Sequence, residues 1–194
     1  MKIIFAHQSN DPEKMIDAGY AIYTETLQNA PHPFPVILLP RTRDAFKPEE
    51  TLIAVNDNNE VIGMALLEPI HDIPKDVGRF GKQAIKTVTE HLSEQPSGHL
   101  HELGGIVVSW DTRGQGMGAA FYKAAARLTD NRVYAVITET NTTSQNAAKR
   151  AGYSRIANAV FNAPFTIKDD FAVPDPKGEH TVVAHIYIPT PPKP

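Results

Sequence analysis

A predicted strand that runs through a glycine-rich turn directly into a helix constrains this chain more than any other feature. The stretch from Glu102 to Gly118 reads Glu-Leu-Gly-Gly-Ile-Val-Val-Ser-Trp-Asp-Thr-Arg-Gly-Gln-Gly-Met-Gly. Glycine allows positive φ and lets a ligand approach the backbone closely. The turn and the first free N–H groups of the helix therefore suit a phosphate or a pyrophosphate, and Arg113 adds a positive charge at the lip.

The hydrophobic pattern on both sides of this segment predicts one α/β domain. Its predicted strands are 2–6, 51–55, 61–67, 100–109, 133–138, 153–161 and 181–188, and its predicted helices are 12–29, 81–93, 117–128 and 144–150. The turn residues 56–59 indicate a hairpin, and Pro69 is expected to end the third strand. The strand, helix and strand within 100–138 imply a parallel pair, so we expect a mixed sheet of about six or seven strands flanked by helices.

Composition excludes several classes of function. A formal net charge of −3 argues against a general nucleic-acid binder. The chain has no cysteine, which rules out disulfides, thiolate metal sites and a cysteine nucleophile. No stretch approaches the ~18 apolar residues of a membrane helix, and the first residues are too short an apolar run for a signal peptide. We expect a cytoplasmic protein with a single domain over 1–188, a cofactor core at about 100–155 and a Pro-rich tail over 189–194.

Three kinds of phosphate site compete for the glycine turn. A P-loop requires Gly-Lys-Ser/Thr, but Ala119 follows Gly118 here. A dinucleotide fingerprint requires Gly-x-Gly-x-x-Gly, whereas Gly114, Gly116 and Gly118 are each two residues apart. Coenzyme A is the remaining interpretation.

Two motifs then resemble a known family. Arg113-x-x-Gly116-x-Gly118 resembles the Arg/Gln-x-x-Gly-x-Gly/Ala signature of the GNAT superfamily of N-acetyltransferases. Asn141, which stands eleven residues before Gly152, resembles the family's second cofactor motif. The resemblance covers about 102–153. It implies a GNAT-like fold and the direct transfer of an acetyl group from acetyl-CoA to an amine of a small molecule or peptide, with no metal.

The same resemblance implies the cofactor-binding residues. The backbone of the strand before the turn would hold the pantetheine arm and polarise the thioester carbonyl, the turn would hold the pyrophosphate, and Asn141 would hydrogen-bond the arm. The residues implied are Ile106, Val107, Val108, Arg113, Gly114, Gln115, Gly116, Met117, Gly118, Ala119 and Asn141.

Glu102 is the candidate general base, because it lies where family members carry a catalytic Glu at the start of the strand. Strict alternation would put Glu102, Gly104, Ile106 and Val108 on one face, where partial burial would raise the pKa of the carboxyl. The alternative is a solvated acid at the strand end. Many members place a general acid Tyr where this chain has Ala148, and Tyr122 or water is left as a substitute.

Other features leave alternatives open. Lys149 and Arg150 suit either the 3′-phosphate of coenzyme A or a solvated helix face. Residues 75–95 lie where they would shape either the acceptor site or the contact of a homodimer. The rival function is a non-catalytic acyl-CoA sensor on the same fold, which acceptor-dependent release of coenzyme A would distinguish from an enzyme.

Overall fold

A seven-stranded mixed sheet forms the centre of the computed structural model, which describes residues 1–29, 41–71, 86–90, 99–163, 165–168, 171–174 and 180–190. In spatial order its strands are β1 (Lys2–Phe5), β2 (Thr51–Val55), β3 (Val61–Ile70), β4 (Leu100–Val108), β5 (Val133–Thr138), β9 (His180–Pro189) and β6 (Tyr153–Ala163). The strands β7 (Phe165–Lys168) and β8 (Phe171–Pro174) form a separate antiparallel ribbon.

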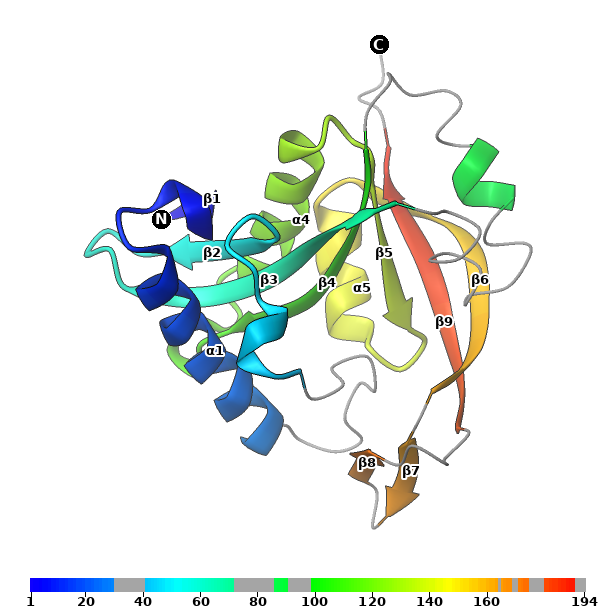
Figure 1. Ribbon diagram of the computed structural model, residues 1–194. Helices are drawn as coiled ribbons and strands as arrows, with labels where there is room; N and C mark the ends of the chain where they lie inside the picture. The colour runs from blue at the N-terminus through cyan, green and yellow to red at the C-terminus, as the bar shows by residue number, and fades with distance from the viewer. Residues whose placement is uncertain are drawn as a thin grey trace.

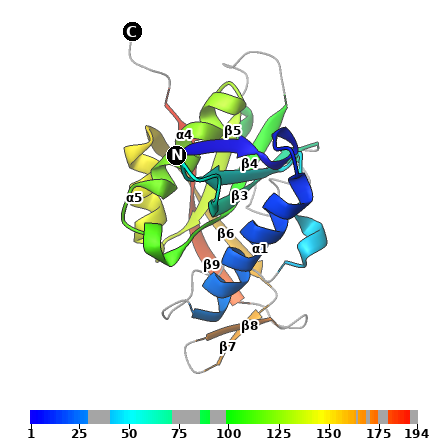
Figure 2. The ribbon, with the colours of Figure 1, turned by 90° about the vertical axis from the view of Figure 1, so that its left-hand side faces the viewer.

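Helices cover both faces of the sheet. Helix α1 (Pro12–Asn29) lies on one face, and helices α4 (Met117–Leu128) and α5 (Thr142–Arg150) lie on the other, as Figures 1 and 2 show from two sides. Short 3₁₀ turns occur at η1 (Ala6–Gln8), η2 (Arg43–Ala45) and η4 (Trp110–Thr112). The side chains of β2 and β3 alternate between two buried clusters, one with α1 and one with α4 and α5, so each helix buries an apolar stripe against the sheet.

The parallel pair of strands is where the sheet opens. All other neighbouring strands of the sheet pair antiparallel, and β5 follows β4 through α4 as a parallel partner. Only His101 with Val133 and Glu102 with Tyr134 are paired between β4 and β5. Beyond these two pairs the strands separate toward their carboxyl ends, beside the start of α4.

A bulge at Gly105 changes the direction of the side chains of β4. Met64 of β3 pairs with Val107 of β4, and Leu66 pairs with Gly104, so β4 has one more residue than β3 between these two pairs. Gly105, within this bulge, has a φ of 58°. After this bulge Ile106 packs against the same cluster under α4 and α5 as Leu103, although the two residues are three positions apart. Strict alternation over the whole strand was therefore a wrong prediction.

With the faces corrected, Glu102 lies on the opposite face of the sheet from Ile106 and Val108. Glu102 and Gly104 flank Leu103 and so point to the face that α1 covers. Ile106 and Val108 point to the face of α4 and α5, and Val107 packs in the cluster under α1.

Most predicted elements are confirmed within a few residues. The bounds of α1, β2, α4 and β5 match, but α5 begins at Thr142 rather than at the predicted 144. The prediction that Pro69 ends β3 is wrong, because β3 continues to Ile70. Since β2 begins at Thr51 opposite Leu66, the later residues of β3 have a strand partner on one side only, where proline is tolerated.

Some predictions fall partly or wholly outside the described residues. Of the predicted helix 81–93, residues 86–90 are described and are helical. Most of the proline-rich tail 189–194 is not described. The pattern gave no sign of β7 and β8, which are only four residues each.

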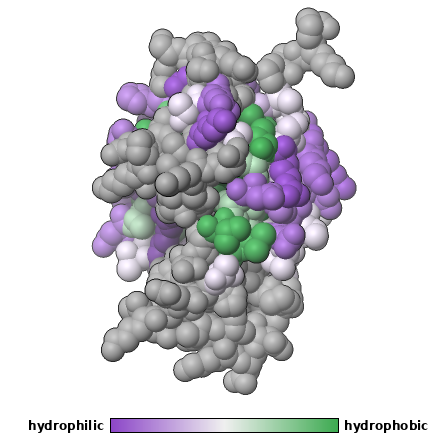
Figure 3. Space-filling model, turned by 90° about the vertical axis from the view of Figure 1, so that its right-hand side faces the viewer, coloured by the Kyte–Doolittle hydropathy of each residue, from purple (hydrophilic) through white to green (hydrophobic). Residues whose placement is uncertain are grey.

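The far edge of the sheet is formed by β6. Figure 3 shows this side of the molecule, where a small hydrophobic area lies among polar residues. Val160 of β6 and Val183 of β9 are register partners and are 56% and 42% exposed. Two valines make a small patch, of the kind common on the surface of monomers.

Candidate acyl-transfer site

A cleft of about 440 Å³ lies at the open end of the parallel strand pair. We call it the cofactor cleft. It is lined by Thr26 of α1, by Ile106, Val107 and Val108 of β4, by Arg113, Gly114, Gly116, Met117, Gly118 and Ala119 of the turn and α4, and by Tyr122, Asn141, Thr143, Ser144, Asn146, Ala147 and Arg150.

The turn presents open backbone to this cleft. Gly114 and Gly116 have φ values of 78° and 83°, which L side chains rarely adopt. A Cβ on either glycine would meet no described atom within 4 Å, so both face open space. Gly116 precedes α4 with no side-chain cap, and the first N–H groups of a helix have no partner within the helix. These donors, with the positive end of the helix dipole, suit an anionic ligand.

Arg113 ties the turn to α1. Its guanidinium lies 3.4 Å from the centroid of the Trp110 ring, and its Nη2 donates to Thr26 Oγ1 at 3.4 Å. The side chain thus lies at the lip of the cleft in a fixed place, where its charge reaches the cleft. Gln115 does not line the cleft, since its Nε2 donates to the carbonyl of Asp111 at 3.1 Å.

A narrow space of about 70 Å³ continues from the cleft between the separated strands, and we call it the β4–β5 gap. Its lining includes Ile106, Tyr122 and Ser144 on the side of α4 and α5. Gly104 and Val136 line it from the other face, where Glu102 also lies. The gap is therefore bounded by residues from both faces of the sheet.

Two polar side chains at this gap have hydrogen-bonding capacity to spare. Thr138 is 3% exposed, and its Oγ1 has no partner among the described residues. Asn141 caps α5 by accepting a hydrogen bond from the backbone N–H of Ser144 at 3.0 Å. Because that bond uses the amide oxygen, the Nδ2 group is left for a second interaction. A buried hydroxyl without a partner among the described residues has capacity for a hydrogen bond to a ligand or a water.

Glu102 is buried, with 8% exposure, so the solvated alternative is excluded. The hydroxyl of Tyr134 donates to Glu102 Oε2 at 2.7 Å. Glu68 of β3, the register partner of Glu102, accepts two hydrogen bonds from Arg41, at 2.7 and 3.1 Å. Burial disfavours the charge of Arg41, but the Glu68 bonds and the nearby Glu102 charge raise the pKa of Arg41. Glu102 is thus held in place beside a charged pair.

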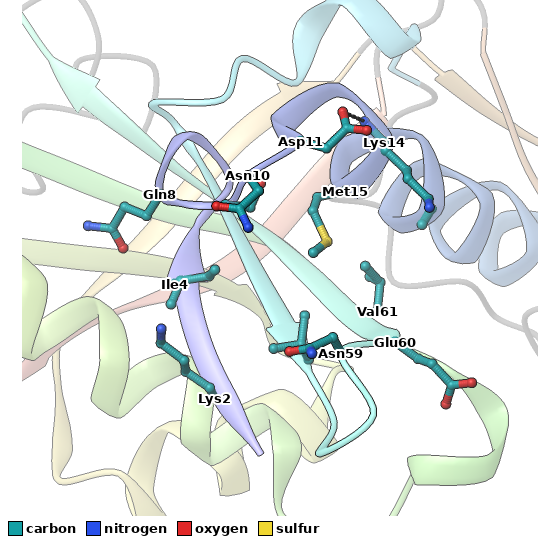
Figure 4. Close-up of a pocket in the computed structure, with 13 residues that line it drawn as sticks. Lys2, Ile4, Gln8, Asn10, Asp11, Lys14, Met15, Asn59, Glu60 and Val61 are labelled. Carbon is teal, nitrogen blue, oxygen red and sulfur yellow. Dashed lines mark hydrogen bonds between the residues drawn. The ribbon is translucent and has the colours of Figure 1, made fainter.

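A second cleft, of about 750 Å³, lies near the N-terminus between β1, the start of α1 and the β2–β3 hairpin. Figure 4 shows Lys2, Lys14 and Glu60 around it, with Met15 among its apolar side chains. No residue of 102–153 lines it. It is the larger of the two clefts, but no glycine turn lines it, and the helix start beside it is capped, because Asp11 Oδ1 accepts a hydrogen bond from the backbone N–H of Lys14 at 3.2 Å.

The structure brings most of the predicted site residues together. Ten of the eleven cofactor residues line the cofactor cleft, and Gln115 is the exception. Arg150 also lines it, whereas Lys149 does not. Glu102 lies on the other side of the gap.

Several side chains of the site had no clear sequence signal. They come from distant segments or from positions that read as ordinary core, and they are Thr26, Arg41, Glu68, Tyr134 and Thr138. Ser144 lies within the second motif, and Tyr122 lies one turn after Gly118, so these two were within reach of the pattern.

Two classes of feature are missing from the part of the chain that the structure describes. In those residues no three His, Asp or Glu side chains are grouped as a metal site would require. The helices in the same residues are too short or too polar to cross a bilayer.

An open helix start beside two separated parallel strands, with a buried carboxylate across the gap, fits an enzyme that binds an anionic cofactor and transfers a group. The model of the acetyltransferase (GNAT) family matches residues 17–153. This is more than half of the chain, so the chain belongs to that family and is an N-acetyltransferase.

Solved structures share the fold. Ribosomal-protein-alanine N-acetyltransferase from Brucella melitensis superposes with a TM-score of 0.55 at 16% identity, covering 97% of this chain and 98% of that one. The Sinorhizobium meliloti phosphinothricin acetyltransferase, solved with AcCoA, superposes with a TM-score of 0.54 at 14% identity, covering 91% of this chain and 83% of that one. An N-acetyltransferase from Staphylococcus aureus superposes with a TM-score of 0.55 at 14% identity, covering 96% of both chains. No curated protein sequence matches significantly.

Proposed function

We propose that this protein transfers an acetyl group directly from acetyl-CoA to a primary amine across the β4–β5 gap, with Glu102 as the general base. The observation that carries the proposal is the position of the gap. It opens from the cofactor cleft on one face and reaches Gly104 on the face of Glu102. Glu102 and Gly104 are two residues apart on that face, about 7 Å along the strand.

The cofactor cleft fits the parts of coenzyme A. The N–H groups from Gly114 to Ala119 would hold the pyrophosphate, helped by the charge of Arg113. Gly105 and Ile106 have a register partner in neither β3 nor β5, and Ile106 lines both the cofactor cleft and the gap, so this segment lies where it would hold the pantetheine arm. The resemblance in sequence assigns the arm to this strand as well.

Side chains complete the binding of the arm. The buried hydroxyl of Thr138 and the Nδ2 of Asn141 both face the gap with capacity for a further hydrogen bond. A backbone N–H of the 106–108 segment would polarise the thioester carbonyl and stabilise the oxyanion that forms on attack. Bound acetyl-CoA supplies the activated acetyl group, and the protein holds it without a covalent intermediate.

Glu102 would activate the acceptor. An alkyl ammonium has a pKa of about 10.4, so at neutral pH it must lose a proton before the nitrogen can attack. The carboxylate of Glu102, alone or through an oriented water, takes that proton. Tyr134 supports this role because its hydrogen bond holds the carboxylate in one orientation inside a buried site.

The acceptor is an amine of a small molecule or of a peptide. Structural relatives include a phosphinothricin acetyltransferase and a ribosomal-protein-alanine N-acetyltransferase, which represent these two kinds of acceptor. Both kinds of acceptor would approach from the face of Glu102, because the cofactor cleft lies across the sheet.

Calorimetric titration with acetyl-CoA, with ATP and NAD as controls, tests the cofactor. Micromolar binding of acetyl-CoA alone is expected. Thiol release is then measured with phosphinothricin, spermidine and a peptide with an N-terminal alanine. Release that depends on one of these amines supports the enzyme. Tight binding without acceptor-dependent release from any amine would favour the sensor instead, and absence of acetyl-CoA binding would overturn the proposal.

A further inference from the structure

In many family members a tyrosine hydroxyl on the helix that corresponds to α5 donates a hydrogen bond to the sulfur that leaves during acetyl transfer. This chain has no hydroxyl at that position, because it has Ala148 there, and Ala148 is fully buried. It belongs to the same core cluster as Tyr122 of α4 and Tyr153 of β6. The position on α5 that usually carries the donor therefore has only a methyl group here.

A pair of hydroxyls from two helices lies at the gap instead. Tyr122 Oη and Ser144 Oγ are 2.8 Å apart. Four residues line both the cofactor cleft and the β4–β5 gap, namely Ile106, Tyr122, Asn141 and Ser144. The gap is small, at about 70 Å³. A thioester that enters so small a space must lie close to the groups that line it.

We propose that Tyr122 donates a hydrogen bond to the departing sulfur, and that Ser144 is its positioning residue. This inference rests on the proposed function. As the amine nitrogen bonds to the acetyl carbon, the C–S bond breaks and sulfur keeps the electron pair. The O–H of Tyr122 stabilises the developing thiolate. Glu102 takes the first proton from the ammonium before attack, the second proton leaves the nitrogen for solvent as the amide forms, and the thiolate later takes a proton from solvent.

The electrostatics of Tyr122 favour a donor that keeps its proton. Burial raises the pKa of Tyr122 to about 12, although the Ser144 hydrogen bond lowers it in part. A thiol ionises near a pKa of ~8.5, so the phenol does not lose its proton to the thiolate. A hydrogen bond to a charged acceptor is stronger than one to a neutral acceptor. The hydroxyl thus stabilises the sulfur as its charge develops.

The surroundings hold the pair in this arrangement. Tyr122 is 2% exposed, and its ring packs edge-on against Tyr153 with centroids 5.1 Å apart. Asn141 fixes the first turn of α5 through the backbone N–H of Ser144. When the Ser144 hydroxyl donates to Tyr122 Oη, the proton of Tyr122 is left for the sulfur.

The variant Tyr122→Phe tests the proposal, because it removes one oxygen and keeps the ring. We expect kcat for thiol release to fall by about tenfold to a hundredfold, the range for a hydrogen bond to a charged group. The Kd for acetyl-CoA should change by less than about threefold, because the bond strengthens only as sulfur becomes charged. The loss should be constant from pH 7 to pH 10, since Tyr122 stays protonated throughout. Ser144→Ala should lose less than Tyr122→Phe.

Tyr153→Phe is the matched control. It also removes a buried tyrosine hydroxyl, one that donates to the backbone carbonyl of Tyr122 at 2.9 Å and lines neither cavity. Its kcat should stay within about twofold of the unmodified protein. An equal loss in both variants, or full kcat in Tyr122→Phe, would overturn the inference while the proposed function stands. An unmodified protein that binds no acetyl-CoA would overturn both.

Discussion

Replacing Gly116 with Glu should remove most of the affinity for acetyl-CoA. Gly116 has a φ of 83°, a conformation that costs an L residue about 1–2 kcal/mol. A Cβ there would meet no described atom within 4 Å, and Gly116 lines the cofactor cleft, so a side chain at this position enters the cleft. A carboxylate about 4 Å from a phosphate charge costs about 4 kcal/mol at an effective dielectric constant of 20. Because every 1.4 kcal/mol is tenfold, Kd should rise roughly a thousandfold.

Gly116→Gln is the control for this change. It has the same backbone strain and nearly the same volume but no charge, so the difference between Glu and Gln isolates the electrostatic part. Calorimetry with acetyl-CoA measures both, and thermal unfolding checks that both are folded. Raising the salt concentration should narrow the difference, since the Debye length is about 10 Å at 0.1 M. If Gly116→Glu binds within tenfold of Gly116→Gln, the pyrophosphate does not lie at this turn.

Glu102→Gln should lower kcat strongly at pH 7 and less at pH 10, where more of the amine is already deprotonated; an equal loss at every pH in thiol-release assays would remove Glu102 from the base role. Tyr134→Phe should lower kcat about tenfold, with KM for acetyl-CoA unchanged, because it frees the carboxylate of Glu102 from a 2.7 Å hydrogen bond; unchanged kcat would contradict that role. Gly63→Ala should lower stability by about 1–3 kcal/mol, because its Cβ would lie 2.8 Å from the carbonyl oxygen of Val107. Thermal unfolding checks this against Gly104→Ala, which has open space and should unfold near the normal temperature.

The sequence was sufficient for local features of the fold. Proline at the start of α1, the apolar stripe from Met117 on α4 and the turn residues of the β2–β3 hairpin are all encoded within a few neighbouring positions. The glycine motif and Asn141 were likewise recognisable, because their spacing is short. These signals predicted the mixed sheet, and ten of the eleven cofactor residues that they named line one cleft.

Features that depend on distant pairing were beyond the pattern. The bulge at Gly105 arises from the register of β4 against β3, and a run of two glycines does not show which of them leaves the ladder. Tyr134 meets Glu102 only because β5 pairs with β4 at that register. Arg41, which lies outside the strands, meets Glu68 of β3 from 27 residues away in the sequence.

Four expectations stay predictions. They are the single domain over 1–188, the homodimer, the cytoplasmic location and the roles assigned to Glu102 and the cofactor residues. The exposed pair Val160 and Val183 is too small by itself to define an interface between two copies.

The narrow β4–β5 gap has a consequence for inhibitor design. A compound that joins coenzyme A to an acceptor must pass its linker through a space of about 70 Å³ bounded by Tyr122, Ile106 and Val136. A chain of single-bonded atoms fits so small a space more readily than an aromatic or branched linker does. Inhibitory potency in such a series should therefore depend more steeply on the cross-section of the linker than on the size of either end group.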